Sequence, residues 1–131
     1  MAALTVAQGI KVSAVDQITG PASEAIAPGD ACFVDASSNG HITPHTGTAV
    51  GIFGIAVGSA VVGEAVTIVI RGLVDLGDAL DGLVYNAPVY AYAAGALDSV
   101  GTSGILVGFV WPGYASTTAD KILWLPGNGG A

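Results

Sequence analysis

Two apolar runs near the middle of the chain carry the clearest secondary-structure signal. Gly51–Val57 and Ala65–Arg71 are rich in β-branched residues and are joined by a short connector that contains Gly, Ser and Glu. Successive side chains of a strand point to opposite faces, so Phe53 and Ile55 share one face. Gly54 lies on the other face, where a second backbone segment can approach closely. We expect these runs to be two strands of the core.

The N-terminal stretch alternates in the same way. Its apolar residues of one parity are Leu4, Val6, Ile10 and Val12. This pattern is typical of a strand or an extended arm. Several Gly and Pro residues follow it and mark a connector. We therefore expect an N-terminal arm over residues 1–20 and a single β domain over residues 21–131.

A β-hairpin is predicted after the connector. Ala31–Ala36 has the length and composition of a short strand, and His41–Thr43 starts the returning strand. Between them, Ser37–Gly40 contains an Asn-Gly pair, which readily adopts positive φ and closes tight turns.

The same succession returns in the second half of the chain. The matched segments are Ala31–Ala36 with Pro88–Ala93, Gly51–Val57 with Ile105–Trp111, and Ala65–Gly72 with Asp120–Gly127. Strand order, turn position and glycine position seldom recur together by chance. We expect two similar β units, at approximately 30–76 and 87–127. Each unit is too small to bury both of its faces alone, so the two are predicted to close on each other as a small all-β barrel.

Composition narrows the classes of partner. The chain has 131 residues, of which 52% are hydrophobic and 10% charged, and its net charge is −7. Lys11, Arg71 and Lys121 are its only Lys and Arg residues, whereas nucleic-acid binding needs clustered cations. We therefore expect no nucleic-acid contact. A surface so poor in charge is expected where partners cover it.

Other features argue against a secreted or membrane-spanning chain. Cys32 is the only cysteine, so no disulfide can form within the chain, and we expect a buried, inert thiol. The N-terminus shows no secretory signal, which favours synthesis and assembly in a cytoplasm. The apolar stretch at 49–63 is shorter than the roughly 20 residues that a spanning helix needs. We expect no membrane insertion.

Candidate chemistry is sparse. Asp75, Asp78 and Asp81 could offer oxygen ligands to a hard cation, but Asp with Gly at this spacing is more typical of turns. His41 and His45 lie in a predicted strand and turn with no third ligand nearby, so we expect both to be exposed polar residues. No nucleophile or phosphate-binding motif is visible. We expect no metal, no cofactor and no enzymatic activity.

The large aromatic residues gather in the second unit. We expect Tyr90 and Trp124 to fill its core. Trp111 and Tyr114 are candidates for an exposed contact surface, because aromatic side chains with one polar end are enriched at interfaces and at sugar-stacking sites.

Two stretches carry a resemblance to a known family. Ala27–Val34 places Gly-Asp at the start of the hairpin strand, and Val62–Leu76 contains Gly-Glu-Ala-Val-Thr-Ile followed by Gly-Leu-Val. With the Gly51–Val57 strand between them, this succession resembles the small capsid decoration, or cement, proteins of tailed bacteriophages. The resemblance covers about Ala22–Leu125.

The resemblance implies an all-β body of the barrel or β-tulip type, often trimeric, on the outer surface of a mature phage head. Such proteins clamp neighbouring major capsid subunits, and an N-terminal arm commonly takes part. We therefore expect a homotrimeric structural protein of the virion that binds the major capsid protein. The candidate interface residues are Leu4, Val6, Ile10, Val12, Trp111 and Tyr114. Removing residues 2–16 is expected to abolish capsid binding and leave the body folded.

Two other classes stay open at this point. A carbohydrate-binding or adhesive module displayed on a virion would expose Trp111 and Tyr114 beside a groove. A β-rich hydrolase would need a pocket that gathers Asp75, Asp78 or His41.

Overall fold

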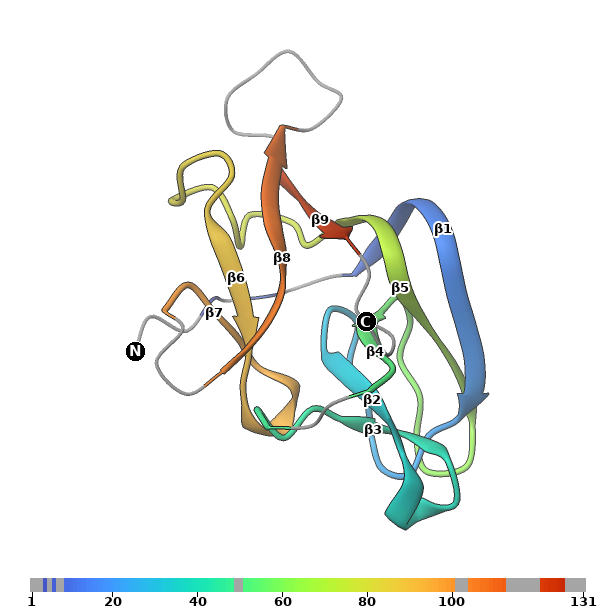
Figure 1. The fold of residues 1–131 in the computed structure, drawn as a ribbon. Helices are drawn as coiled ribbons and strands as arrows, with labels where there is room; N and C mark the ends of the chain where they lie inside the picture. Colours follow the sequence, from blue (N-terminus) through green and yellow to red (C-terminus); the bar gives the residue numbers. More distant parts are fainter. Residues whose placement is uncertain are drawn as a thin grey trace.

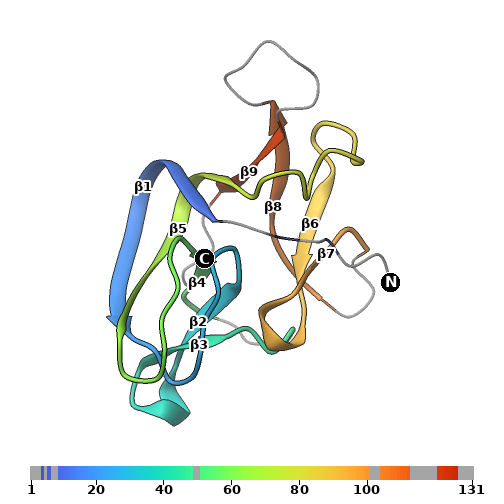
Figure 2. The same ribbon diagram turned by 180° about the vertical axis from the view of Figure 1, so that it is seen from behind.

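The chain forms an antiparallel β-sheet that curls into a half-barrel (Figures 1 and 2). The computed structural model describes residues 4, 6, 9–48, 51–100, 104–112 and 121–126. The elements are β1 (Ile10–Pro21), β2 (Ala31–Asp35), the 3₁₀ turn η1 (Ala36–Ser38), β3 (His41–Pro44), β4 (Phe53–Ala56), β5 (Ala65–Asp75), β6 (Pro88–Ala91), the 3₁₀ turn η2 (Ala93–Gly95), β7 (Leu97–Asp98), β8 (Ile105–Pro112) and β9 (Lys121–Pro126). The predicted all-β class is confirmed.

The body is built from two similar units, as predicted. The strand order is β3-β2-β4-β5 in the first unit and β7-β6-β8-β9 in the second. Figure 1 shows β6, β7 and β8 on one side of the molecule and β2, β3 and β4 on the other. In each unit a 3₁₀ turn closes the hairpin, and two successive residues at its end have positive φ: Asn39 and Gly40, then Ala94 and Gly95.

The likeness of the units extends to single backbone hydrogen bonds. In the first unit the Gly29 N–H donates to the Ala56 carbonyl, and in the second the Asn86 N–H donates to the Val110 carbonyl, both at 2.8 Å. Gly29 and Asn86 both have positive φ, at 89° and 67°. The two units therefore share a hydrogen-bond register as well as a strand order.

The long strand β5 joins the two units. One edge pairs with β1 along its whole length, and the other pairs first with β4 and then with β9. Gly72 has φ of 143° at a point where the β1–β5 register shifts. Val69 and Val74 lie on either side of this irregularity. Both reach the same core cluster, although an odd and an even position of a regular strand would point to opposite faces. The irregularity thus lets one strand serve both units.

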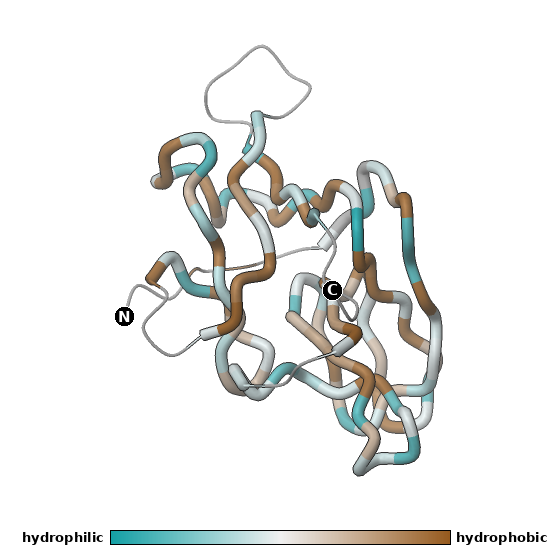
Figure 3. Tube along the Cα trace, viewed as in Figure 1, coloured by the Kyte–Doolittle hydropathy of each residue, from teal (hydrophilic) through white to brown (hydrophobic). Residues whose placement is uncertain are grey.

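Two hydrophobic clusters form the core. The smaller lies within the first unit and consists of Ala22, Ile26, Cys32, Ile42, Ala56, Ala60, Val66 and Ile68. The larger combines side chains of both units, such as Ile55 and Val69 from the first and Val110 and Leu123 from the second. Figure 3 shows hydrophobic residues along the strands of both units and in the β5–β6 connection. The larger cluster therefore holds the two units together.

The N-terminal stretch is extended, but the residues that are described lie on the chain's own body. The Leu4 N–H donates to the Leu97 carbonyl at 3.0 Å, and the side chains of Leu4 and Val6 pack against the larger cluster. Ile10 pairs with Asp75 at the start of β1. The expected separation of an arm from the body is therefore not seen here.

The pairing of β1 with β5 has a physical reason. An unpaired β5 edge would leave a row of backbone donors and acceptors without partners, and β1 supplies those partners.

Candidate functional site

Three aromatic side chains of β8 and β9 form a row that we call the aromatic surface: Phe109, Trp111 and Trp124. The Phe109 and Trp124 ring centroids are 6.1 Å apart, with an interplanar angle of 36°. The Trp111 and Trp124 centroids are also 6.1 Å apart, at 38°. Trp111 is 43% exposed and Trp124 is 38% exposed. The row is thus continuous and open to solvent.

Side chains of β8 and β9 alternate between the two faces of the sheet, and this alternation places the three rings on one face. Val110, Leu123 and Leu125 point into the larger core cluster, so their neighbours in sequence point to the opposite face. The expectation that Trp124 fills the core is therefore wrong. The alternating signal was present in the sequence, because Leu123 and Leu125 flank Trp124.

The other predicted contact residues divide into three groups. Tyr114 lies outside the described residues. For Ile10 and Val12 the backbone is described as part of β1, but the side chains are not. Leu4 and Val6 face the chain's own core. Of the N-terminal candidates, the two whose side chains are described, Leu4 and Val6, therefore lie on the chain's own core and not beside Trp111.

The cross-strand partners of Trp111 and Trp124 are apolar. Trp124 pairs across the sheet with Phe109 on β8 and Leu73 on β5, and Trp111 pairs with Ile122 on β9. A sugar site normally adds precisely placed polar groups to an aromatic platform. These cross-strand partners offer none, so the row is better suited to an apolar protein surface.

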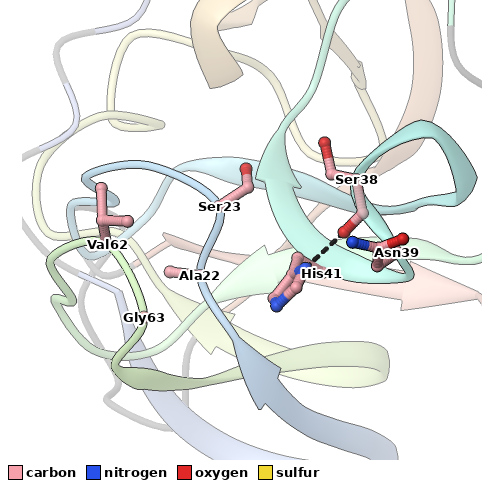
Figure 4. Close-up of a pocket in the computed structure, with 7 residues that line it drawn as sticks. All are labelled: Ala22, Ser23, Ser38, Asn39, His41, Val62 and Gly63. Atoms are coloured by element: carbon pink, nitrogen blue, oxygen red, sulfur yellow. Dashed lines mark hydrogen bonds between the residues drawn. The ribbon is translucent and has the colours of Figure 1, made fainter.

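A shallow pocket of about 290 Å³ lies in the first unit (Figure 4). The β2–β3 hairpin, the segment after β1 and the β4–β5 turn contribute its lining: Ala22, Ser23, Ser38, Asn39, His41, Val62 and Gly63. The His41 Nδ1–H donates to the Ser38 carbonyl. The Ser23 hydroxyl lies 2.7 Å from the Thr43 hydroxyl. The pocket thus holds His41 without Asp75 or Asp78, and its lining supplies no acid–base pair for hydrolysis.

Asp75, at the end of β5, and Asp78 and Asp81, in the β5–β6 connection, do not form a cation site. Asp75 Oδ1 accepts a hydrogen bond from the Gly77 N–H at 2.8 Å, as in an Asx-turn. At Asp81 the backbone carbonyl, not the carboxylate, accepts a hydrogen bond from Lys121 Nζ at 3.1 Å. Among the residues that the structure describes, no group of three His, Cys, Asp or Glu could hold a metal ion. Asp75 therefore has the turn role that its sequence context favours.

His45 differs from its prediction. It is fully buried, and its ring lies edge-on between Phe33 and Phe53, with centroids 5.8 Å and 5.1 Å away. Its Nδ1 accepts from the Gly47 N–H at 2.9 Å, and its carbonyl accepts from the Gly95 N–H of η2 at 3.0 Å. The expectation of an exposed side chain is therefore wrong. His45 helps to join the first unit to the second.

A pH dependence follows from this burial. Desolvation lowers the pKa of His45 in the folded chain, so the unfolded chain binds more protons as pH falls below about 6.5. Stability is then fully present above the unfolded pKa and is lost as pH falls toward the folded pKa, by at most about 1.4 kcal/mol per pH unit. We expect thermal unfolding to show this decline between pH 7 and 5. His45→Asn should flatten the curve.

His41→Asn is the matched control for the pH experiment, because His41 is only half-buried; it should leave the decline unchanged. Burial raises the pKa of the Asp30 carboxyl. This shift makes stability fall as pH rises, which is opposite to the His45 effect, but it acts at the lower pH where carboxyl groups ordinarily titrate. An unchanged slope in His45→Asn would show that another group causes the decline.

Cys32 is buried, as predicted. Its thiol donates to the Asp30 backbone carbonyl, with Sγ 3.6 Å from the oxygen. Burial raises the pKa of the thiol well above its usual range, and the Asp30 and Glu24 carboxylates add to this shift. A thiolate nucleophile is therefore disfavoured at this position.

Comparison with known proteins adds no family: no protein-family model and no curated protein matches the chain. Within the described residues, no helix is long and apolar enough to cross a membrane. The aromatic surface and the small pocket therefore have to be interpreted from their geometry.

Proposed function

We propose that the chain is a capsid decoration protein of a tailed bacteriophage. In this proposal it binds the outer surface of the head as a homotrimer and clamps neighbouring major capsid subunits. The observation that carries it is a charge-poor body with large hydrophobic side chains exposed in both units, including Val61 and Val62 in the first and Trp111 and Trp124 in the second. Trp111 and Trp124 form a contiguous part of this exposed surface, and contiguous apolar patches are typical of surfaces that become covered on assembly.

The segments that resemble the family also have a structural reason to recur. Asp30 Oδ2 accepts from the Ala27 N–H at 3.0 Å, just before β2. Glu64 Oε1 accepts from the Val61 N–H at 2.9 Å, just before β5. In both places the acidic residue closes a turn three residues back and starts a core strand. The Gly-Asp and Gly-Glu pairs thus have the same role in the turns before two core strands, and this common role supports the proposal.

The decisive experiment for this proposal is saturable binding to shells. Purified protein is mixed in increasing amounts with undecorated heads of the phage that encodes it, and the heads are pelleted. We expect binding to saturate at a fixed ratio to the major capsid protein and the heads to unfold at a higher temperature. Multivalent contact around the lattice strengthens modest single contacts.

The control is the same protein centrifuged without heads. A protein that stays in the supernatant at every ratio would contradict the proposal. Unsaturable pelleting in proportion to protein concentration would also contradict it.

A virion-displayed carbohydrate-binding module is the second candidate, and the exposure of Trp111 favours it. The tilted rings and apolar neighbours of the aromatic surface weigh against it. Binding on a glycan array that Trp111→Ala abolishes would favour this candidate over decoration.

A further inference from the structure

The link that follows β3 connects the two units through a buried histidine. Residues 45–48, which we call the strap, leave the first unit and reach the β6–β7 hairpin of the second (Figures 1 and 2). The His45 N–H donates to the Ala31 carbonyl of β2 at 2.8 Å, and the His45 carbonyl accepts from the Gly95 N–H of η2 at 3.0 Å. Gly47 packs so closely on the second unit that an added Cβ would lie 3.2 Å from a Cα there. The strap thus lies directly against the backbone of both units.

The hydrogen bonds of His45 decide which ring nitrogen carries the proton. Nδ1 accepts from the Gly47 N–H at 2.9 Å, so it is assigned as unprotonated, and the proton of the neutral ring is then on Nε2. Within the part of the chain that the structure describes, this Nε2 is buried and has no hydrogen-bond partner. The contact between the strap and η2 therefore fits only the neutral form of the ring.

A second proton would make two contacts of the ring unfavourable at once. Protonated Nδ1 is a donor, and it would face the Gly47 N–H, which is also a donor. The charge would lie between the rings of Phe33 and Phe53, whose centroids are 5.8 Å and 5.1 Å from that of His45. Burying a charge in apolar surroundings is costly. Both penalties disappear if the strap moves away and the ring reaches water.

The titratable groups on the elements around His45 are engaged elsewhere. β4 and η2 carry none. Each of the others makes a hydrogen bond with a residue no more than eight positions away in sequence. They are Asp30 before β2, Cys32 and Asp35 on β2, His41 on β3, Tyr92 before η2 and Asp98 on β7. Burial, rather than a neighbouring charge, is what lowers the pKa of His45.

From this geometry we propose that the strap is a proton-controlled switch between the two units. At mildly acidic pH a proton on His45 opens the contact between the strap and η2, while the strands of the sheet stay paired. The opening is local because the strap has only four residues and belongs to no strand, and short segments open at lower cost than a whole sheet. It therefore precedes the global unfolding to which His45 also contributes. This inference does not depend on capsid binding, and its test contains no shells.

Amide hydrogen exchange followed by NMR tests the switch residue by residue. The quantity compared is the protection factor, the intrinsic exchange rate divided by the observed rate, which removes the ordinary effect of pH on exchange. For the Gly47 and Gly95 amides we expect it to fall by up to about tenfold between pH 7.5 and 5.5, because His45 titrates near 6.5 once the strap is open. The Val110 amide, which donates to the Ala87 carbonyl at 2.9 Å, is the internal control and should keep its protection.

Three variants assign the effect to one side chain. His45→Asn is the matched variant, because its amide oxygen can still accept from the Gly47 N–H but does not titrate; protection at Gly47 should then be independent of pH. His41→Asn and Asp30→Asn are the controls. His41 donates to the Ser38 carbonyl instead of the strap, and Asp30 is the carboxyl beside η2, with Cγ 3.4 Å from the place of a Cβ on Gly95. Both controls should keep the pH dependence of the original chain.

Three results would overturn the inference. Equal loss of protection at Gly47, Gly95 and Val110 would show that the sheet opens as a whole. Protection at Gly47 and Gly95 that does not change with pH would show that no proton acts on the strap. A pH dependence that persists in His45→Asn, or that disappears in Asp30→Asn, would assign the effect to another group. The comparison of the three amides in the original chain decides the question even if His45→Asn does not fold.

Discussion

Replacing Gly54 with alanine is expected to destabilise the folded chain by about 3 kcal/mol or more. The added Cβ would overlap the carbonyl oxygen of Val69 and lie 2.8 Å from its carbonyl carbon. Both atoms belong to the backbone of β5, which cannot move away as a flexible side chain could. Relief therefore requires β4 to separate from β5 inside the core. Equilibrium unfolding in urea measures the loss.

Gly58→Ala is the matched control for Gly54→Ala. Gly58 lies just beyond β4, and a Cβ there would meet no atom within 4 Å, so this variant should stay within about 0.5 kcal/mol of the original chain. Gly108→Ala should repeat the large loss in the second unit, because its Cβ would overlap the Trp124 carbonyl oxygen. Equal stability of Gly54→Ala and Gly58→Ala would rule out the close approach of β4 to β5.

Deleting residues 2–16 is expected to unfold the body, contrary to what the sequence alone indicates. The deletion removes the part of β1 that pairs with β5 from Asp75 to Arg71. It also removes the packing of Leu4 and Val6 on the larger core cluster. The total stability of a domain is only roughly 5–15 kcal/mol, so the loss of more than half of β1 and its buried contacts is expected to exceed what the rest can compensate.

Circular dichroism and amide proton dispersion in NMR spectra measure the effect of this deletion. Val15→Ser is the control within the same strand, because Val15 is exposed; it should remain folded. If the truncated chain kept its sheet and lost only its binding to shells, the result would contradict this prediction. The N-terminal stretch would then be an arm that contacts a partner.

The salt bridge between Asp16 and Arg71 is not the reason for the expected loss. The two atoms Arg71 Nη2 and Asp16 Oδ2 are 3.4 Å apart, and both side chains are at least half exposed. Exposed ion pairs contribute at most about 1 kcal/mol. The backbone pairing and the apolar packing of β1 carry the effect.

Local signals in the sequence were sufficient for much of the fold. Period-two alternation predicted the strands at Gly51–Val57 and Ala65–Arg71, and the Asn-Gly pair predicted the turn between β2 and β3. Glycine placement predicted the close backbone approach at Gly54. These features depend on residues that are near in sequence and on the intrinsic conformations of the backbone. The amino-acid sequence is therefore enough to predict them.

The candidate site was only partly predictable. Trp111 was identified as a contact candidate, and its exposure follows from the alternation of β8. Trp124 was missed, although the same rule applied to Leu123 and Leu125. The residue type alone does not distinguish a tryptophan that fills a core from one that covers the outside of a sheet, so the alternation of the neighbouring positions has to decide.

Patterns in the sequence are therefore sufficient to predict the core strands, the turn between β2 and β3 and the two similar units. They do not predict how β5 serves both units, why β1 belongs to the body, or that His45 is buried where its carbonyl meets the Gly95 N–H of the second unit. The physical reason is separation along the chain. These arrangements depend on which distant strands share an edge and which faces meet across the core, and such contacts leave no periodic trace in the sequence.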